Sequence, residues 1–557
     1  MGGFERLISV VGIVGLAFGF SLSGCAVEQG LGERGVAKKQ QGPGSECAQT
    51  LENRDQYITA LRSANQGAWT QAEHALEAVI STCPSYLMAR ETLAGWYLQD
   101  GRAEDARAVL GGLAVADGAV GWGLLAQIEL ACGDFDAALD AAEKAGEFGG
   151  LVEQGGLVSQ IERARIASLA PALWTVEPLW QANSNASEHS PLWNEDTGQL
   201  YFTSRRGARV EGTCEQGDAS LAPDGQPWEQ IYVLHGADGD GASGAVPTSK
   251  AVGHLATVGW LPTHGNEVEG GQMVIFNGQA TGADGSLAMV TWEGAGGWSE
   301  PVDLPKAVNS RWPEYGATFS ADGQTLYFSS ERPGGYGGRD LYRIHRLPDG
   351  MWSRAVVLGP EVNTAGDEDA PFVEAGGGRL FFSSNGHAGM GGFDIYSVAL
   401  GGFGKAGDIH AMGRRENVGA PINSTCDDTH YFATGTGAVY FTSDRVGGAG
   451  RSDIYRAVPK SPSDAVDARQ VFTGAFELPG GAPAKVKLVL NGEDGRQRIY
   501  RARVGDGQFV LALDPHQNHN LSVHLGEKQV YTLEIGATRP TQRPQNLGRI
   551  HLQNLAP

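Results

Sequence analysis

Alternating bulky and small residues, followed by a glycine-rich loop, recur three times in the second half of the chain. The copies run from Leu326 to Tyr342, from Leu380 to Tyr396 and from Val439 to Tyr455. Each contains an aromatic pair, two hydroxyl residues, the loop and then Asp-(Ile/Leu)-Tyr, a pattern that predicts a β-hairpin with a tight turn. The aromatic pairs lie 54 and then 59 residues apart, with further short strands between them. Four antiparallel strands in a repeat of this length predict one blade of a β-propeller.

Two weaker copies extend the repeat toward the N-terminus, one beginning at Leu200 and the other at Met273. Together the copies predict five blades over residues 171–459. The last copy ends after its third strand near Pro459, whereas Trp174 to Ser184 has the pattern of an outer strand and no blade of its own. We therefore expect this N-terminal strand to complete the last blade and close the ring, which would remove exposed sheet edges.

Residues 47–170 have helical spacing and are rich in Ala, Leu and Glu. A short motif recurs there around Gly67, Gly101 and Gly133, at intervals of 34 and 32 residues. The motif resembles tetratricopeptide repeats, which implies stacked helix pairs that present a groove for a peptide or a helix. A purely structural spacer is the alternative interpretation.

A linker at residues 460–470 leads into a last region, 471–557, in which hydrophobic residues alternate with a period of two. The expected strands are 471–476, 484–490, 499–504, 508–513, 521–525 and 530–535. The pattern around Gly474 and Phe509 resembles transthyretin-like and carboxypeptidase-regulatory sandwiches, with an immunoglobulin-like sandwich as the alternative. The expected architecture is therefore multidomain: α-helical repeats, a five-bladed β-propeller closed by an N-terminal strand, and a small C-terminal β-sandwich.

The first 24 residues are expected to be a signal peptide rather than part of a fold. Arg6 provides a positive start, and Leu7 to Phe20 is an apolar stretch too short to span a bilayer as a permanent helix. The segment LSGC at residues 22–25 resembles a bacterial lipobox, which implies cleavage before Cys25, lipidation of its thiol and anchoring to the outer membrane, facing the periplasm or the cell surface. An ordinary signal peptide with an incidental cysteine is the alternative. Residues 25–46, rich in Gly, Gln and Lys, predict a flexible tether.

The composition narrows the possible partners. A formal net charge of −22 over 557 residues argues against binding to nucleic acid. The 82 glycines match a β architecture with many loops.

Five cysteines beyond Cys25 fit an oxidising compartment. We expect Cys214, in a loop of the first blade, to pair with Cys426, just before the first strand of the fifth, because the first and last blades of a closed ring are neighbours. Cys47 and Cys83 are a second candidate disulfide across the first helices, which leaves Cys132 as a buried thiol.

Four carboxylates stand thirteen residues before the equivalent aromatic position of their blades. They are Glu188, Glu314, Glu368 and Asp427. These groups are expected to surround one mouth of the central channel, where they would attract a cation or a basic peptide. Alternatively, each caps backbone N–H groups of its own blade. Arg332 and Arg445 are expected to pair with Asp340 and Asp453 within their hairpins.

Known catalytic motifs are missing from the sequence. It has no G-x-S-x-G elbow, no Walker loop, no H-E-x-x-H and no G-x-G-x-x-G between a strand and a helix. It also has no His/Cys cluster with the spacing of a metal site. We therefore expect no catalytic residue, no cofactor and no metal.

The signature SSxRxGGxGxxDIY resembles the repeats of the periplasmic Tol-associated propeller protein and related envelope lipoproteins. The order of the regions resembles PorE-type lipoproteins of the type IX secretion and gliding machinery. That family normally ends in an OmpA-like peptidoglycan-binding domain, which this sequence does not contain, so direct peptidoglycan binding is not expected. The resemblance implies a non-enzymatic scaffold with envelope proteins as partners. The alternative is a binding module for a small ligand, a glycan or a cell-wall fragment at the channel mouth.

Overall fold

The computed structural model describes most of the chain from Ser45 to Leu552. The described residues are 45–48, 50–110, 119–147, 156–170, 174–207, 221–222, 224–235, 244–245, 253–261, 271–279, 285–294, 297–401, 412–460, 469–477, 486–491, 497–503, 507–526, 528–538 and 544–552. Among them, no helix is long and apolar enough to cross a membrane. The signal peptide, Cys25, the tether and most of the linker lie outside the described residues.

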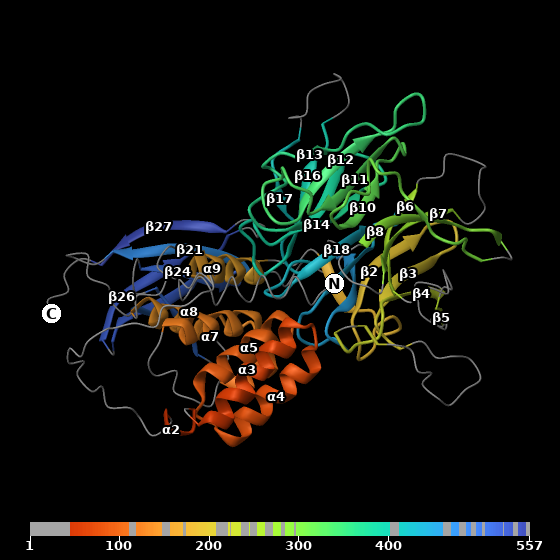
Figure 1. The fold of residues 1–557 in the computed structure, drawn as a ribbon. Coiled ribbons are helices and arrows are strands. Elements are labelled where there is room, and N and C mark those ends of the chain that lie inside the picture. The colour runs from red at the N-terminus through yellow and green to blue at the C-terminus, as the bar shows by residue number, and fades with distance from the viewer. Residues whose placement is uncertain are drawn as a thin grey trace. The chain divides into compact units, whose positions relative to one another are not determined.

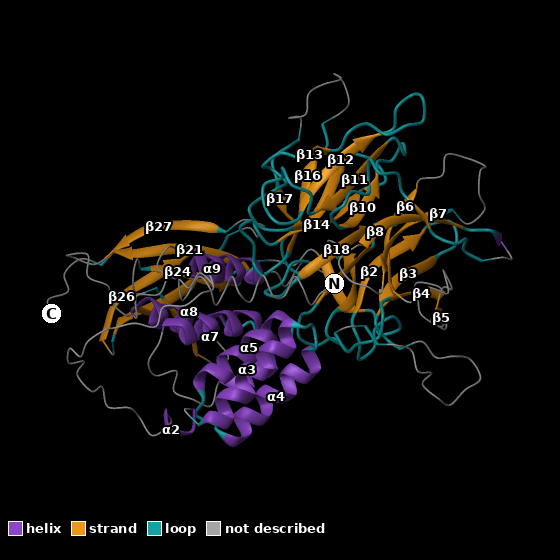
Figure 2. Cartoon of the chain, in the orientation of Figure 1, coloured by secondary structure: helices purple, strands orange, loops and turns teal. Residues whose placement is uncertain are grey.

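The N-terminal part is helical (Figure 2). Its helices are α2 (Ser45–Ala48), α3 (Leu51–Asn65), α4 (Trp69–Thr82), α5 (Leu87–Gln99), α6 (Ala103–Leu110), α7 (Ala119–Ala131), α8 (Phe135–Glu147) and α9 (Gly156–Leu169). The three motif glycines, Gly67, Gly101 and Gly133, each follow the first helix of a pair with φ between 72° and 79°. A positive φ at these positions ends one helix and lets the chain reverse into the next, which is why the motif requires glycine.

Five four-stranded sheets follow the helices along the chain (Figure 1). Their strands are β1 (Trp174–Pro178), β2 (Glu188–Asn194), β3 (Gln199–Ser204), β4 (Gln230–His235), β5 (Gly244–Ala245), β6 (Gly253–Leu261), β7 (Gln272–Gln279), β8 (Gly285–Thr291), β9 (Val302–Asp303), β10 (Glu314–Phe319), β11 (Thr325–Ser330), β12 (Asp340–His345), β13 (Val356–Val357), β14 (Glu368–Val373), β15 (Arg379–Ser384), β16 (Asp394–Ala399), β17 (Glu416–Asn417), β18 (Asp428–Ala433), β19 (Val439–Ser443) and β20 (Asp453–Pro459). The strand orders are β2-β3-β4-β5, β6-β7-β8-β9, β10-β11-β12-β13, β14-β15-β16-β17 and β18-β19-β20-β1.

The sheets are arranged as the blades of a propeller. The innermost strands contact one another in sequence, β2 with β6, β6 with β10, β10 with β14 and β14 with β18, and β18 contacts β2. The segment that leads from β1 to β2 is bonded to β20 of the last sheet: the backbone N–H of Leu179 donates to Ile454 O at 2.8 Å, and the Asn183 side chain bonds both the N–H and the carbonyl of Ile454. The coarse expectation of a mostly β chain with a propeller is therefore confirmed.

The C-terminal part consists of two further sheets. Their strands are β21 (Gln470–Glu477), β22 (Val486–Asn491), β23 (Gln497–Arg501), β24 (Gln508–Leu513), β25 (His519–Leu525), β26 (Lys528–Ile535) and β27 (Gln545–His551), in the orders β24-β21-β27 and β23-β22-β25-β26. Phe472, Leu488, Phe509 and Val523 meet in a common buried core. The sequence did not indicate β27, which pairs with β21 in parallel, because its residues are mostly exposed and lack a regular alternation.

Candidate functional site

The carboxylates expected around the channel mouth lie inside the blades. Glu188, Glu314 and Glu368 have no exposed surface. Glu314 accepts hydrogen bonds from the backbone N–H of Ser310 at 3.0 Å, from its hydroxyl at 2.7 Å and from the Ser330 hydroxyl at 3.0 Å. The other two have the equivalent Ser and Thr partners. A ring of exposed acids at the mouth is therefore wrong for these three, and the alternative, that each bonds groups of its own blade, describes them.

The fourth carboxylate of this expected ring was misaligned by one residue. Asp428, and not Asp427, lies opposite Ser443, as Glu314 lies opposite Ser330. The intervening hairpin is one residue shorter in the last blade, where the partners are 15 rather than 16 positions apart in the sequence, so a fixed count from the aromatic pair fails there. Asp427 itself accepts the backbone N–H of Phe393 at 2.7 Å, and burial raises its pKa to about 6.

The repeated arginines bind these buried carboxylates and not the aspartates expected from the sequence. Arg332 donates to Glu314 at 2.8 Å, and its guanidinium lies over the Phe328 and Tyr342 rings at 4.7 and 5.1 Å from their centroids. Arg445 pairs with Asp428 in the same way, at 2.6 Å.

Asp340 and Asp453, the expected partners, instead hold the glycine-rich loops. Asp340 accepts the backbone N–H groups of Tyr336 and Gly337, and Asp453 accepts those of the equivalent loop residues. The charged residues that recur in the repeat therefore bind partners within their own blades.

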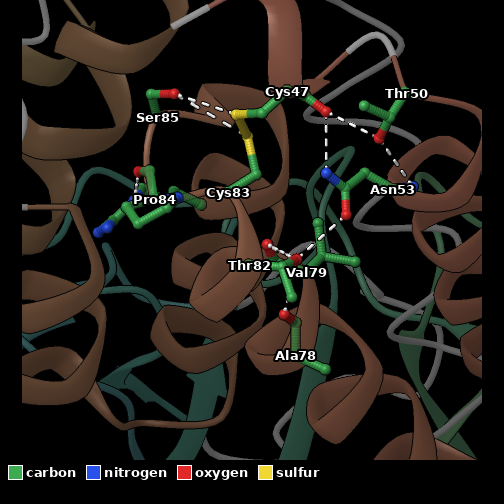
Figure 3. Close-up of a disulfide and its surroundings, with 10 residues drawn as sticks. Cys47, Thr50, Asn53, Ala78, Val79, Thr82, Cys83, Pro84 and Ser85 are labelled. Carbon is green, nitrogen blue, oxygen red and sulfur yellow. Dashed lines mark hydrogen bonds between the residues drawn. A yellow bond between two sulfur atoms is a disulfide. The ribbon is translucent and has the colours of Figure 1, made fainter.

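A disulfide joins Cys47 to Cys83, the pair that the sequence favoured across the first helices, with 5.8 Å between the two Cα atoms (Figure 3). Cys214 lies outside the described residues, so its pairing with Cys426 stays a prediction. The Cys426 thiol donates to Ala131 O at 3.4 Å.

A cavity of about 650 Å³ lies where the five innermost strands meet. All five strands, β2, β6, β10, β14 and β18, contribute to its lining, and we call it the channel pocket. Each of these strands has a β-bulge partway along its length. Three residues at the bulges are not glycine and still have a positive φ: Ser190 at 55°, Ala370 at 48° and His430 at 52°. Such backbone strain and bulges gather at binding sites, where they redirect side chains.

Two histidines hold one carboxylate of the channel pocket. Glu229 lies just before β4, with Oε2 at 3.1 Å from Nδ1 of His254 and Oε1 at 3.7 Å from Nε2 of His189. Burial opposes ionisation of Glu229, but the hydrogen bonds and charges of the two imidazoles outweigh it and hold the pKa well below its ordinary range. Glu229 is therefore a hydrogen-bond acceptor at neutral pH.

A second carboxylate, Asp369, is held by an arginine. The Arg339 guanidinium pairs with Asp369, and the Ser329 hydroxyl of the preceding blade donates to Asp369 Oδ1 at 2.5 Å. Burial opposes ionisation here too, yet Arg339 and Ser329 outweigh it and lower the pKa. Arg339 also lies 4.1 Å above the Tyr315 ring, which fixes the direction of its donors.

Aromatic side chains form much of the remaining wall. Trp193 stacks on Tyr440 with 5.9 Å between ring centroids, and its carbonyl accepts the indole N–H of Trp260 at 2.9 Å. Phe372 lies 4.8 Å from Phe432, centroid to centroid. The channel pocket therefore combines flat apolar surfaces with ionised, fixed polar groups.

These pocket residues were not among the candidates predicted from the sequence, although one signal pointed to three of them. His189, Tyr315 and Asp369 each come directly after a buried carboxylate of the repeat. Side chains of adjacent strand residues point to opposite faces, so a carboxylate held in the blade places its successor toward the channel. No group of three or more His, Cys, Asp or Glu residues suited to a metal ion occurs in the described part of the chain.

No family model matches this chain, and no curated protein matches it. Solved structures do match, at low similarity. A thermostable family-43 glycoside hydrolase has 9% identity and a TM-score of 0.33 over 56% of this chain and 93% of its own. An endo-arabinase from Bacteroides thetaiotaomicron has 13% identity and a TM-score of 0.32 over 51% and 96%. An α-L-arabinofuranosidase from Lactobacillus brevis has 11% identity and a TM-score of 0.33 over 50% and 91%.

These matches contradict two expectations from the sequence, the non-enzymatic character and the role as a protein scaffold of a secretion complex. The matched proteins are glycoside hydrolases by their printed names. At such scores, the case for any ligand of this chain depends on the channel pocket itself.

Proposed function

We propose that the channel pocket binds a glycan. The observation that carries this proposal is the combination, in one cavity of about 650 Å³, of aromatic walls with carboxylates fixed in their ionised form. Cavities of this size accommodate small ligands, with a few placed polar groups that set orientation. Sugars present apolar C–H faces and a rim of hydroxyl groups, so they need both kinds of surface at once.

The polar groups of the pocket include both acceptors and donors, as hydrogen bonding to sugar hydroxyls requires. Glu229 and Asp369 offer ionised acceptors, which form stronger hydrogen bonds than neutral ones. Arg339 offers donors beside them, and Tyr315 fixes its plane. Histidine and arginine partners hold these carboxylates before a ligand arrives, so binding requires little further ordering.

We infer the finer features of the chain on separate grounds. Gly67, Gly101 and Gly133 between paired helices support tetratricopeptide-like repeats, and the junction of β18 with β2 supports a five-bladed ring closed by β1. The strand pattern of the C-terminal part supports a transthyretin-like sandwich. The lipobox at residues 22–25 supports an outer-membrane lipoprotein of the general PorE and Tol-propeller type.

The proposal is tested by measuring glycan binding to the full-length mature protein by calorimetry, after a screen on a glycan array. Glu229→Gln and Asp369→Asn keep the shape of each side chain and remove its charge. We expect each change to weaken binding at least about tenfold, because a hydrogen bond to a charged group contributes more than a neutral one. Glu416→Gln is the matched control. Glu416 lies on the outer strand β17, where its exposed carboxylate pairs with Arg379, and it does not line the pocket.

Release of reducing sugar from the bound glycans is measured in parallel. Glycosidic cleavage requires one protonated and one ionised carboxyl group. Glu229 and Asp369 are both held in the ionised form, so another group would have to donate the proton to the leaving sugar. Product release abolished by the same two variants would show that the site is hydrolytic. Absence of any glycan ligand, or binding unaffected by both variants, would reject the channel pocket as a glycan site.

A further inference from the structure

The charges that line the channel pocket are strongly unbalanced. They comprise five carboxylates and one guanidinium: Glu195, Asp196, Glu229, Asp369, Glu374 and Arg339. No lysine is among the described residues that line the cavity. The single guanidinium is already paired with Asp369, so four carboxylates remain without a guanidinium partner in the lining.

Three of these carboxylates lie on turns at the end of the pocket. Glu195 and Asp196 are in the β2–β3 turn, and Glu374 begins the β14–β15 turn. Glu195 accepts the backbone N–H of Gly435 from the β18–β19 turn at 2.5 Å, which fixes its position. None of the three forms an ion pair with another residue in the described part of the chain.

The histidines of the described residues do not pair with the three turn carboxylates. Burial, together with the charge of His189, lowers the pKa of His430 to about 3, so that its ring is neutral. His189 and His254 both lie beside the carboxylate of Glu229. The three turn carboxylates therefore have no histidine or guanidinium as an ion-pair partner in the described part of the chain.

We propose that the glycan bound in the channel pocket carries protonated amines, as a polymer of amino sugars does; this inference rests on the proposed function. Walls of low dielectric concentrate the field of like charges and favour ligands of the opposite sign. The aromatic walls add to this preference, because the face of an indole or phenol ring attracts a cation. An acidic glycan, rich in uronic acids, meets repulsion from the same groups.

The test compares three oligosaccharides of equal length on the full-length mature protein: deacetylated chito-oligosaccharide, its fully N-acetylated form and oligogalacturonate. Calorimetry at mildly acidic pH keeps the amines charged. We expect the deacetylated form to bind at least about tenfold more tightly than the acetylated one, with the difference shrinking as salt is added. Oligogalacturonate should bind weakest.

Substitution of the turn carboxylates tests whether the preference for amines arises at this pocket. Glu195→Gln and Glu374→Gln should each reduce the preference for the amine by roughly threefold, the size expected for a partly exposed charge pair. Glu300→Gln, an exposed carboxylate outside the pocket, is the control and should leave the preference unchanged.

The possible outcomes separate the two proposals. If the acetylated form binds as tightly as the deacetylated one, and Glu229→Gln still weakens both, the glycan site stands and the preference for amines is wrong. If oligogalacturonate binds more tightly than the deacetylated form, the preference for amines is likewise wrong and the glycan site stands. If none of the three binds and the glycan array gives no other ligand, both proposals fail.

Discussion

The two consecutive hydroxyl residues of each repeat have different partners. Ser330 donates to the buried Glu314 of its own blade, whereas Ser329 donates to Asp369 of the next blade. In the first blade, Ser204 bonds Glu188, and Thr203 bonds Thr257 of the second. One position therefore satisfies a buried charge, and the other joins neighbouring blades beside the channel.

A buried aspartate in the fourth blade makes stability depend on pH. Asp394 accepts the N–H groups of Met390 and Gly391, and burial, together with the charge of Asp428, raises its pKa from 3.8 to about 7. The folded protein thus holds this proton more tightly than the unfolded chain, so stability falls as pH rises from about 4 to about 7, by at most about 1.4 kcal/mol per pH unit. Asn cannot ionise, so Asp394→Asn should gain stability relative to the wild type across this window. Urea unfolding at a series of pH values measures the difference.

The control for this experiment is Asp349→Asn, which changes an exposed aspartate in a turn. Its stability relative to the wild type should be constant across the same window. A constant difference for Asp394→Asn as well would mean that this carboxyl is already ionised at low pH in the folded protein.

The sequence located the charged positions of the repeat but not the direction of their side chains. Glu314 and Asp369 are both acids near the start of an innermost strand, yet the first is enclosed in its blade and the second lines the channel pocket. The bulges that separate these directions, with strained residues such as Ala370, leave no pattern in a single sequence. Glu229 and Arg339 come from other parts of their blades, and only the fold brings them to the pocket.

At the scale of elements, the glycine-rich loops are contacts between blades as well as turns. A side chain at Gly337 would lie 2.4 Å from the carbonyl oxygen of Gly366, and one at Gly391 would lie 1.9 Å from that of Cys426. Both carbonyls belong to the segment that leads into the next blade. The sequence predicted these glycines as turn residues, and the close approach to the next blade was visible only in the structure.

The equivalent glycine of the last blade tests the junction with the first. A Cβ at Gly450 would lie 1.8 Å from Ala186 O and 2.6 Å from Ser184 O, which are backbone atoms that cannot rotate away. We expect Gly450→Ala to lower the free energy of unfolding by about 2 to 3 kcal/mol, as overpacking does in a close contact. Chemical denaturation followed by tryptophan fluorescence measures the change.

Gly376→Ala is the matched control, because a Cβ there meets no atom within 4 Å. Its effect should stay within about 0.5 kcal/mol. Equal stability of the two variants would contradict a close contact between the last blade and the first.

The repeat made the propeller predictable because each blade carries the same hydrophobic alternation and the same loop. The helices were predictable for a similar reason, since Gly67, Gly101 and Gly133 mark where each pair reverses. The parallel strand β27 was not predictable, because its pairing with β21, far away in the sequence, is decided by packing. The cysteine pairing inside the helical region could be inferred, since Cys47 and Cys83 flank the first helix pair.

At the scale of the whole molecule, the parts are stabilised by different means. The propeller buries tyrosines and phenylalanines such as Tyr327 and Phe382. The helical region buries many alanines, including Ala60, Ala72 and Ala89. Alanine contributes little apolar area per residue, so a covalent link should supply a larger share of the stability of the helices than it would elsewhere in the chain.

Removing the disulfide tests this balance. Cys47 and Cys83 are 36 residues apart, and the chain-entropy model gives roughly 3 to 4 kcal/mol for closing a loop of this length. We expect the double variant Cys47→Ser/Cys83→Ser to lose that stability in the helical part, seen by far-ultraviolet circular dichroism of the helices on heating, with the unfolding transition of the propeller unchanged. Cys132→Ser is the control, since burial raises the pKa of this half-buried thiol to about 11 and it forms no disulfide in the described part of the chain. If the double variant unfolds at the wild-type temperature, the packing of the helices suffices without the disulfide.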